Sequence, residues 1–233
     1  MLQNVKGATG LIVMLNDKID QEVIEAAGEG LKVVSSYSAG FDHVSLPVLK
    51  ERKIRLGFTP DALTDAVADL SIYLALGASR LTGVATRRVI AGEWPKMPWS
   101  PLLLTGQSFT NKTIGFLGFG RIAQATLVRM MAYSPKNVIY TTSVPGKKAS
   151  HDYYSLLAEA KIPIQPATSI EQIATESDVL FVCCALSPET KNLVDAAFLA
   201  KMKSTAVIVN TARGPIIDSD ALAVALKEEK LLG

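Results

Sequence analysis

The stretch Thr113-Ile-Gly-Phe-Leu-Gly-Phe-Gly-Arg-Ile-Ala123 decides the fold of this chain. Its first five residues are an apolar run typical of a buried strand, and a helical pattern begins at Arg121. Outward from this stretch in both directions, short apolar runs alternate with helical patterns. Strands that alternate with helices form parallel sheets covered by helices on both faces. The sequence therefore predicts an α/β fold with a doubly wound parallel sheet.

The alternation predicts the following elements. We expect strands at residues 10–15, 32–36, 54–57, 113–117, 137–142, 162–165, 178–185 and 205–210, and helices at residues 21–27, 46–52, 64–79, 84–91, 121–132, 152–159, 171–175, 196–202 and 220–228. Asp20 and Ser169 are the expected helix caps. The helix over residues 64–79 has one apolar stripe, made of Val67, Leu70, Leu74 and Leu81. Residues 94–110 contain three prolines and two tryptophans and are expected to form a long irregular loop.

The composition excludes several classes of protein. Of the 233 residues, 48% are hydrophobic and 20% are charged, and the net charge is +2. Such a small positive charge does not indicate a nucleic acid or an acidic membrane surface as a partner. The longest apolar run, residues 179–186, is far shorter than the roughly 20 residues of a membrane-spanning helix. Cys183 and Cys184 lie within this run, and buried free thiols favour a reducing compartment, so we expect a cytoplasmic protein.

The glycines at the centre of the opening stretch have the spacing of a dinucleotide-binding turn, between a strand and a helix as that motif requires. Gly118 permits the tight turn, and Gly120 leaves room for a pyrophosphate. The amides of Arg121 and Ile122 would meet its charge at the helix N-terminus. The alternative is a glycine-rich turn that binds no ligand.

The residues after the next strand bear on which dinucleotide binds. NAD sites usually have an Asp or Glu about 20 residues beyond the glycines, where it accepts the ribose hydroxyl. Residues 137–150 contain no acid, and instead carry hydroxyls followed by Lys147 and Lys148. Hydroxyls and lysines suit a 2′-phosphate, which a carboxylate would repel. NADP is therefore favoured over NAD, although lysine pairs also occur on surfaces that bind nothing.

Two further polar turns follow predicted strands, where ligands bind in open α/β sheets. Arg213 follows the strand at residues 205–210, and its guanidinium could hold a carboxylate or stabilise a developing oxyanion. A surface arginine is the alternative. The turn Ser38-Ala-Gly-Phe-Asp42 offers backbone amides to a small anion. The simpler interpretation of this turn is a loop in which Asp42 caps the next helix.

The chain has two histidines, His43 and His151. His43 follows Asp42, which suggests a catalytic pair, but we expect His43 to occupy the first turn of the next helix. His151 follows the two lysines and is expected to be exposed. The two cysteines lack a metal-binding spacing, and we predict no metal site.

Five motifs, taken together and in order, resemble the D-2-hydroxyacid dehydrogenase family over essentially the whole chain. They are Ser38-Ala-Gly-Phe-Asp-His43, Gly57-Phe-Thr-Pro-Asp61, Gly118-Phe-Gly-Arg-Ile-Ala123, Ala185-Leu-Ser-Pro-Glu-Thr190 and Asn210-Thr-Ala-Arg-Gly214. The resemblance, strongest to the glyoxylate/hydroxypyruvate reductase branch, implies an NADP-dependent reductase of small 2-keto acids. Hydride transfer to C2 would give a D-2-hydroxy acid. It also implies a Rossmann-like dinucleotide-binding domain at residues 63–233 and part of a flavodoxin-like substrate domain at residues 1–62.

The resemblance also implies roles for individual residues. The amides of Ala39 and Gly40 would hold the substrate carboxylate, and Arg213 would bind and polarise the substrate as the catalytic residue. The implied cofactor-binding residues are Gly118, Gly120, Arg121 and Ile122 at the pyrophosphate, Thr142, Ser143, Val144, Pro145 and Gly146 at the 2′-phosphate, and Ala185 and Thr211 along the nicotinamide half. Family members usually dimerise through the nucleotide domain, with residues 94–110 as the equivalent of an interface arm.

The family pattern also differs from this chain. Family chains begin with a further strand–helix–strand segment before the equivalent of Gly10, and their catalytic Glu and His follow the equivalent of Gly233. Reduction of a ketone needs a proton for the oxygen, which a guanidinium does not release. The alternation also calls for another strand beside residues 205–210, whose open apolar edge would favour aggregation. We therefore expect a fragment or truncated form that is inactive alone.

A function of another class is the alternative. The chain could be a cofactor-binding interaction or sensor protein, like the corepressors that share this fold. Binding of keto acids would favour the enzyme, and partner binding that depends on the cofactor would favour the corepressor-like protein.

Overall fold

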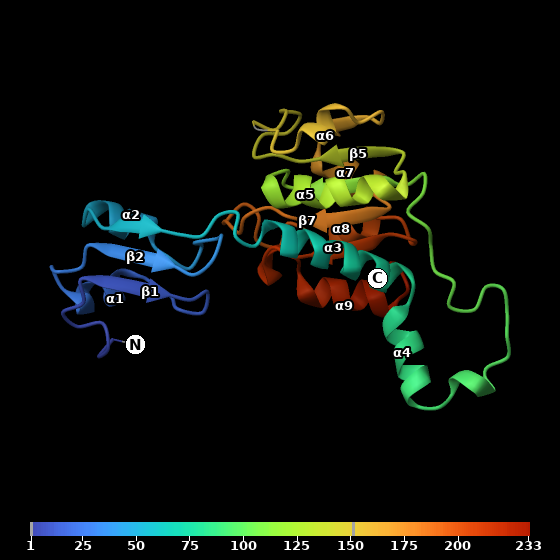
Figure 1. Cartoon of the computed structure of the whole chain (residues 1–233), viewed down its shortest axis with the longest axis horizontal. Helices are drawn as coiled ribbons and strands as arrows, with labels where there is room; N and C mark the ends of the chain where they lie inside the picture. The colour runs from blue at the N-terminus through green and yellow to red at the C-terminus, as the bar shows by residue number, and fades with distance from the viewer. Residues whose placement is uncertain (1, 151) are drawn as a thin grey trace. The chain divides into compact units, whose positions relative to one another are not determined.

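The computed structural model describes residues 2–150 and 152–233, so the prediction for His151 lies outside the described residues. The chain divides into two compact units, Met1–Thr64 and Asp65–Gly233. Both units contain parallel sheets with helices between the strands, as Figure 1 shows. The predicted α/β class is confirmed.

Unit 1 (Met1–Thr64) is built on a three-stranded parallel sheet. Its strands, in spatial order, are β1 (Gly10–Val13), β2 (Val33–Ser36) and β3 (Arg55–Gly57), and its helices are α1 (Gln21–Ala27) and α2 (Leu46–Glu51). As predicted, Asp20 caps α1, because its carboxylate accepts a hydrogen bond from the Val23 amide. Ile24, Val34 and Leu49 are fully buried in the core of this unit.

Unit 2 (Asp65–Gly233) is built on a five-stranded sheet in the order β6-β5-β4-β7-β8, with all pairs parallel. The strands are β4 (Thr113–Leu117), β5 (Asn137–Tyr140), β6 (Ile164–Pro166), β7 (Val179–Val182) and β8 (Val207–Asn210). The chain enters at the centre and extends the sheet first to one side and then to the other. Between β4 and β7 the order reverses, and this is the place where ligands bind in doubly wound folds.

Helices cover both faces of this sheet. The helices of the unit are α3 (Thr64–Ser79), α4 (Thr82–Ile90), α5 (Arg121–Met130), α6 (Ser155–Ala158), α7 (Ile170–Glu176), α8 (Ala196–Lys201) and α9 (Ser219–Lys227), with 3-10 turns at Trp94–Lys96, Met131–Tyr133 and Gly214–Ile216. Phe116 packs in the core cluster that includes α3 and α5, and its neighbour Leu117 packs in the cluster that includes α7, α8 and α9. This alternation follows from the pleat of a strand, which points successive side chains to opposite faces.

Two predictions for this unit are corrected. The leucine stripe of α3 is not the face that packs on the sheet, because Leu70 and Leu74 are 48% and 39% exposed whereas Ala68 and Ala75 are fully buried. Small side chains let a helix approach a sheet closely, so the large ones project from its other face. The outer edge of β8 was expected to be open, but residues 232–233 cover part of it. The Ile208 amide donates to the Gly233 carbonyl, and the Leu232 amide donates to the Ala206 carbonyl.

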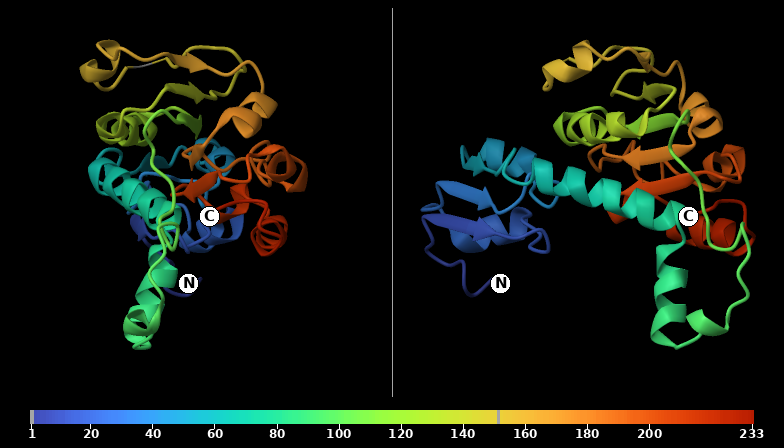
Figure 2. Two further views of the ribbon diagram at one scale, coloured as in Figure 1. Left: turned by 90° about the vertical axis from the view of Figure 1, so that its right-hand side faces the viewer. Right: turned by 45° about the vertical axis from the view of Figure 1, so that its right-hand side comes forward.

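Residues 94–110 form the irregular loop that the prolines predicted, apart from the short turn at Trp94–Lys96. In both views of Figure 2, α4 and this loop extend away from the sheet of unit 2 before the chain returns to β4. Within the described residues, no helix is both long and apolar enough to cross a membrane.

Candidate cofactor-binding and substrate-binding sites

Gly118, directly after β4, occupies a position that only glycine fits. Its φ is +84°, a conformation that L side chains rarely adopt. A Cβ at this position would lie 2.8 Å from both Cα and N of Cys184, which follows β7. The Gly118 amide donates to Oγ1 of Thr141, after β5, at 3.0 Å. The turn is therefore held by the two neighbouring strands, and Thr141 has a role in it that sequence reasoning missed.

Gly120 differs from Gly118 because packing within the protein does not explain it. Its φ is −84°, which any residue can adopt, and apart from Gly120 and its two neighbours in the chain no described atom lies within 4 Å of the position of an added Cβ. The space above Gly120 therefore suits a ligand that approaches the backbone. This open cradle fits the pyrophosphate of a dinucleotide.

The N-terminus of α5 begins at this cradle. Gly120 is its N-cap, and among the described residues no side chain caps the helix. The first amides of a helix have no acceptor within it and carry partial positive charge, so the amides of Arg121 and Ile122 suit a phosphate.

Tyr153 and Gln124 support Arg121 at the start of α5. The Arg121 guanidinium lies 4.6 Å from the centre of the Tyr153 ring. Oε1 of Gln124, which is buried, accepts from the Tyr153 amide at 2.8 Å. Arg121 and Tyr153 are far apart in the sequence, so no local pattern could have paired them.

The loop after β5, predicted to surround a 2′-phosphate, is fixed by its own backbone. Thr142 Oγ1 donates to the Val144 carbonyl at 2.9 Å, and the Gly146 amide donates to the Ala167 carbonyl at 2.9 Å. Ser143, Val144 and Pro145 are exposed between these two contacts. The loop thus presents its residues to solvent on a defined backbone.

Arg213 lies in the loop after β8, just before the turn at Gly214–Ile216. Asn210 closes this loop, since its side chain donates to the Arg213 carbonyl at 2.9 Å and accepts from the Ala212 amide at 3.0 Å. The half-buried Arg213 side chain donates to the Ala212 carbonyl at 3.0 Å. The motif Asn210-Thr-Ala-Arg-Gly214 therefore presents a guanidinium at the carboxyl end of β8.

Ser71 of α3 orients Thr211 in the same loop. The fully buried Ser71 hydroxyl donates to the Val67 carbonyl at 2.8 Å and lies 3.1 Å from the Thr211 hydroxyl. A serine hydroxyl has one proton, so Ser71 accepts from Thr211 in the second contact. Sequence reasoning missed Ser71, which lies in a helix 140 residues away from Thr211.

The segment after β7 contains the two cysteines and Ala185. Cys183 packs against the core cluster on one face of the sheet and Cys184 against the cluster on the other, as expected for neighbours on a strand. Burial raises the pKa of Cys184 and raises that of Cys183 to about 12, so both stay as thiols near neutral pH. The Ala185 carbonyl accepts from Thr190 Oγ1 at 2.7 Å, which orders the motif that begins at Ala185.

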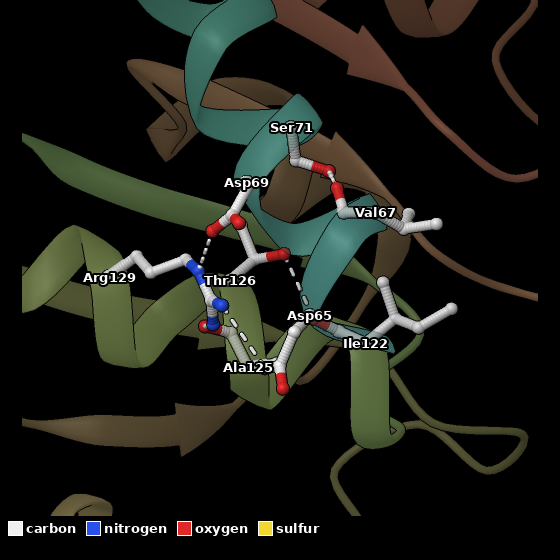
Figure 3. A network of polar contacts seen from close by, with 8 residues as sticks. All are labelled: Asp65, Val67, Asp69, Ser71, Ile122, Ala125, Thr126 and Arg129. Carbon is white, nitrogen blue, oxygen red and sulfur yellow. Dashed lines mark hydrogen bonds and ion pairs between the residues drawn. The ribbon is translucent and has the colours of Figure 1, made fainter. Parts of the chain in front are cut away.

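Arg129 fastens α5 to α3, as Figure 3 shows. Its guanidinium pairs with Asp69 and, at 3.1 Å, with Asp65, and also donates to the Ala125 carbonyl within α5. Asp65 is the first residue of unit 2. The beginning of unit 2 is therefore attached to α5, the helix that Gly120 precedes.

In unit 1, the turn after β2 differs from its simpler interpretation. The cap of α2 is Ser45, not Asp42, and His43 lies in a turn before the helix rather than in its first turn. The reason is that Pro47 fits the second position of a helix, so α2 begins only at Leu46. In the described part of the chain, the amides of Ala39 and Gly40 have no acceptor, as an anion site requires.

Comparison with known proteins identifies the family. Residues 72–233 match the model of the D-isomer specific 2-hydroxyacid dehydrogenase NAD binding domain. The chain belongs to the D-2-hydroxyacid dehydrogenase family. The matched residues, 72–233, all lie within unit 2, so unit 2 contains the nicotinamide cofactor-binding domain.

Individual 2-hydroxyacid dehydrogenases are similar over the whole chain. Glyoxylate reductase of Thermofilum pendens is 39% identical over 233 residues, and human glyoxylate reductase/hydroxypyruvate reductase is 36% identical over 229 residues. These matches cover 100% and 98% of this chain, which spans 65% and 66% of the two relatives. A crystal structure of a glyoxylate reductase from Paecilomyes thermophila matches with a TM-score of 0.82 and 30% identity, over 99% of this chain and 68% of that one.

Proposed function

We propose that this chain is part of an NADP-dependent reductase of small 2-keto acids such as glyoxylate and hydroxypyruvate. NADPH, when bound, supplies the hydride that reduces C2 to give a D-2-hydroxy acid. The cradle above Gly120 carries the proposal, because it is a glycine position that a bound ligand explains and internal packing does not. The similarity to reductases of glyoxylate supports the substrate class.

Each unit supplies part of the chemistry in this proposal. In unit 2, the amides of Arg121 and Ile122 bind the pyrophosphate, while Ala185 and Thr211 lie along the nicotinamide half. Arg213 holds the substrate carboxylate and stabilises negative charge on the ketone oxygen. In unit 1, the amides of Ala39 and Gly40 bind the carboxylate of the keto acid. These residues bind and orient, but none of them releases a proton at neutral pH.

We propose that the 233-residue chain alone binds the cofactor and does not turn over. Reduction of the ketone requires a proton donor for its oxygen, and the Arg213 guanidinium does not release a proton. The test is oxidation of NADPH by the purified chain with hydroxypyruvate, beside NADPH binding by fluorescence. We expect binding without steady turnover, and sustained NADPH oxidation by metal-free chain would contradict the proposal.

The preference for NADP over NAD rests on the loop after β5. Thr142 to Gly146 surround the 2′-phosphate in this proposal, and residues 137–150 contain no acid that would repel it. The exposed Ser143 side chain is free to face the ribose without disturbing the bonds that hold the loop.

Ser143→Asp is expected to weaken NADPH binding about tenfold and to leave NADH binding equal or better, because a carboxylate repels the 2′-phosphate and accepts ribose hydroxyls. The measurement is titration of both cofactors with fluorescence detection. Ser100→Asp, with the same charge change on an exposed serine in the loop after α4, is the matched control. Tighter NADH than NADPH binding by the unaltered chain would refute the proposed preference.

We also propose a homodimer formed through unit 2. Large apolar side chains are exposed on the outer face of α3, on α4 and on the loop that extends away from the sheet: Leu70, Tyr73, Leu74, Val89, Ile90, Trp94, Trp99, Leu102 and Leu103. A cavity of about 420 Å³, lined in part by Tyr73, Phe109 and Tyr133, lies at the base of this projection. Exposed apolar surface of this extent marks an interaction site, and a second copy offers the matching surface.

Ile90→Glu is expected to convert the dimer to a monomer, raising the dimer dissociation constant at least about 100-fold, because a two-fold interface buries the new charge twice. Sedimentation equilibrium measures this change. Val224→Glu, which alters an exposed apolar side chain on α9, should leave the dimer intact. A wild-type chain that is monomeric at micromolar concentration would disprove the dimer.

We propose a cytoplasmic location for this chain. Cys183 and Cys184 are both free and half-buried, and free thiols persist in a reducing compartment.

A further inference from the structure

The turn Ser38–Gly40 in unit 1 is connected to His43 by a chain of hydrogen bonds. Nε2 of His43 lies 3.0 Å from the Ser36 hydroxyl, which lies 3.0 Å from the Ser38 hydroxyl. The Ser38 hydroxyl in turn bonds the carbonyl of Gly40. Both serines are buried, with exposed fractions of 1% and 6%. Sequence reasoning singled out His43 but found no role for it.

The direction of each bond follows from the number of protons. A carbonyl can only accept, so Ser38 gives its single proton to Gly40. Ser36 must then donate to Ser38, which leaves Ser36 able only to accept from His43. His43 therefore carries a proton on Nε2, and the chain runs from the imidazole to the Gly40 carbonyl in one direction.

The other ring nitrogen agrees with this assignment. Nδ1 of His43 is buried and has no hydrogen-bond partner among the described residues. No acceptor in the described structure binds a proton on Nδ1, so no hydrogen bond on this side of the ring opposes the direction of the relay. The neutral ring with the proton on Nε2 keeps all the bonds of the chain.

The chain acts on the backbone of the anion-binding turn. The Ser38 carbonyl accepts from the Thr59 amide at 2.9 Å, which fixes the peptide between Ser38 and Ala39. The Ser38 hydroxyl fixes the peptide between Gly40 and Phe41 through the Gly40 carbonyl. In a trans peptide the N–H points opposite to the C=O, so the Ala39 amide is directed away from Thr59. The amide of Gly40 lies between these two fixed peptides.

We propose that His43 is a positioning residue for the carboxylate-binding turn, and that it acts through Ser36 and Ser38 rather than on the substrate. This inference rests on the proposed function, in which the Ala39 and Gly40 amides bind a keto-acid carboxylate. A relay of buried single-proton groups is rigid, because each group can satisfy its neighbour in only one orientation. The turn is thereby held ready for the anion before it binds.

The first test uses ¹⁵N NMR of the full chain to determine which ring nitrogen of His43 carries the proton. The spectra are recorded above the pH range in which histidines titrate. His151→Gln assigns the signals, since the chain has only two histidines. We expect the Nε2-protonated form. The Nδ1-protonated form would overturn the proposal, whatever the chain binds.

The second test compares variants by two measurements. These are the affinity for oxalate, used as a carboxylate probe, and the NMR resonances of the Ala39 and Gly40 amides. Ser38→Ala should move both resonances and weaken oxalate binding about tenfold, as the loss of one buried hydrogen bond predicts. In Ser38→Thr, which keeps the hydroxyl, the amide resonances and the oxalate affinity should stay close to those of the wild-type chain. Ser45→Ala removes a serine hydroxyl of the same unit that makes no capping hydrogen bond, and should change neither the resonances nor the affinity.

The histidine itself is tested with His43→Gln, whose amide N–H can reach Ser36, and His43→Leu, whose side chain cannot donate. We expect His43→Gln to retain most of the oxalate affinity. We expect His43→Leu to lose about as much affinity as Ser38→Ala. Equal effects of the two would refute positioning through the hydrogen bond. Failure of the wild-type chain to bind oxalate would count against the proposed substrate role of the turn. In that case the His43 tautomer and the amide resonances of the variants would still show whether the relay exists.

Discussion

Gly120→Ala is expected to weaken NADPH binding about 100-fold, or roughly 2.7 kcal/mol, while the free energy of unfolding changes by no more than about 1 kcal/mol. Beyond the adjacent residues of the chain, the added methyl group meets no atom of the described structure within 4 Å, and the φ of −84° suits alanine. It would, however, occupy the space proposed for the pyrophosphate. Fluorescence titration with NADPH and urea unfolding measure the two effects.

Gly118→Ala is the matched comparison, two residues away in the same turn. Here the methyl group would lie 2.8 Å from the backbone of Cys184, at a φ of +84°. Backbone atoms cannot move aside as a flexible side chain does, so we expect the free energy of unfolding to fall by about 2–4 kcal/mol. If Gly120→Ala instead destabilises the protein as much as Gly118→Ala and leaves NADPH affinity unchanged, the cradle is structural and the proposed cofactor site is wrong.

Arg213→Gln is expected to weaken the binding of oxalate to the NADPH-saturated chain by about 30-fold, because charge-assisted hydrogen bonds contribute about 1.5–3 kcal/mol each. Arg213→Lys should recover little of this affinity, since an ammonium group cannot form the two parallel bonds of a guanidinium with a carboxylate. Isothermal titration calorimetry measures the affinity for all three proteins.

Two comparisons separate binding from folding in this experiment. The Arg213 side chain also donates to the Ala212 carbonyl, so the unfolding midpoint of each variant should be recorded. Arg88→Gln removes the same charge from the last turn of α4, a helix that extends away from the sheet (Figure 2). Wild-type oxalate affinity in Arg213→Gln would exclude Arg213 as the substrate-binding residue.

Sequence patterns predicted the elements of this fold well. The helix at residues 64–79 and the strand at residues 113–117 have the bounds that periodicity gave them, and Asp20 and Ser169 cap the helices expected of them. These features depend on residues close together in the chain, which is why a local pattern is sufficient to predict them. The glycine turn was found for the same reason.

Contacts between distant segments were not predictable in this way. The buried face of α3 was misjudged because the choice depends on how closely the helix approaches the sheet, and this distance is not encoded by a stripe of leucines. Ser71 beside Thr211, Thr141 beside Gly118 and Tyr153 beside Arg121 join segments from different strands and helices.

The sequence by itself thus determined the α/β class, the order of strands and helices, and the positions of the glycine turn and of Arg213. The tertiary structure decided which glycine is needed for packing and which leaves space for a ligand, since that depends on whether Cys184 lies against the turn. It also decided that His43, Ser36 and Ser38 lie in one line of hydrogen-bond contacts, which gives the proposed relay its direction. The physical reason is that a hydroxyl has one proton to give, so its direction is fixed only when every neighbour is in place.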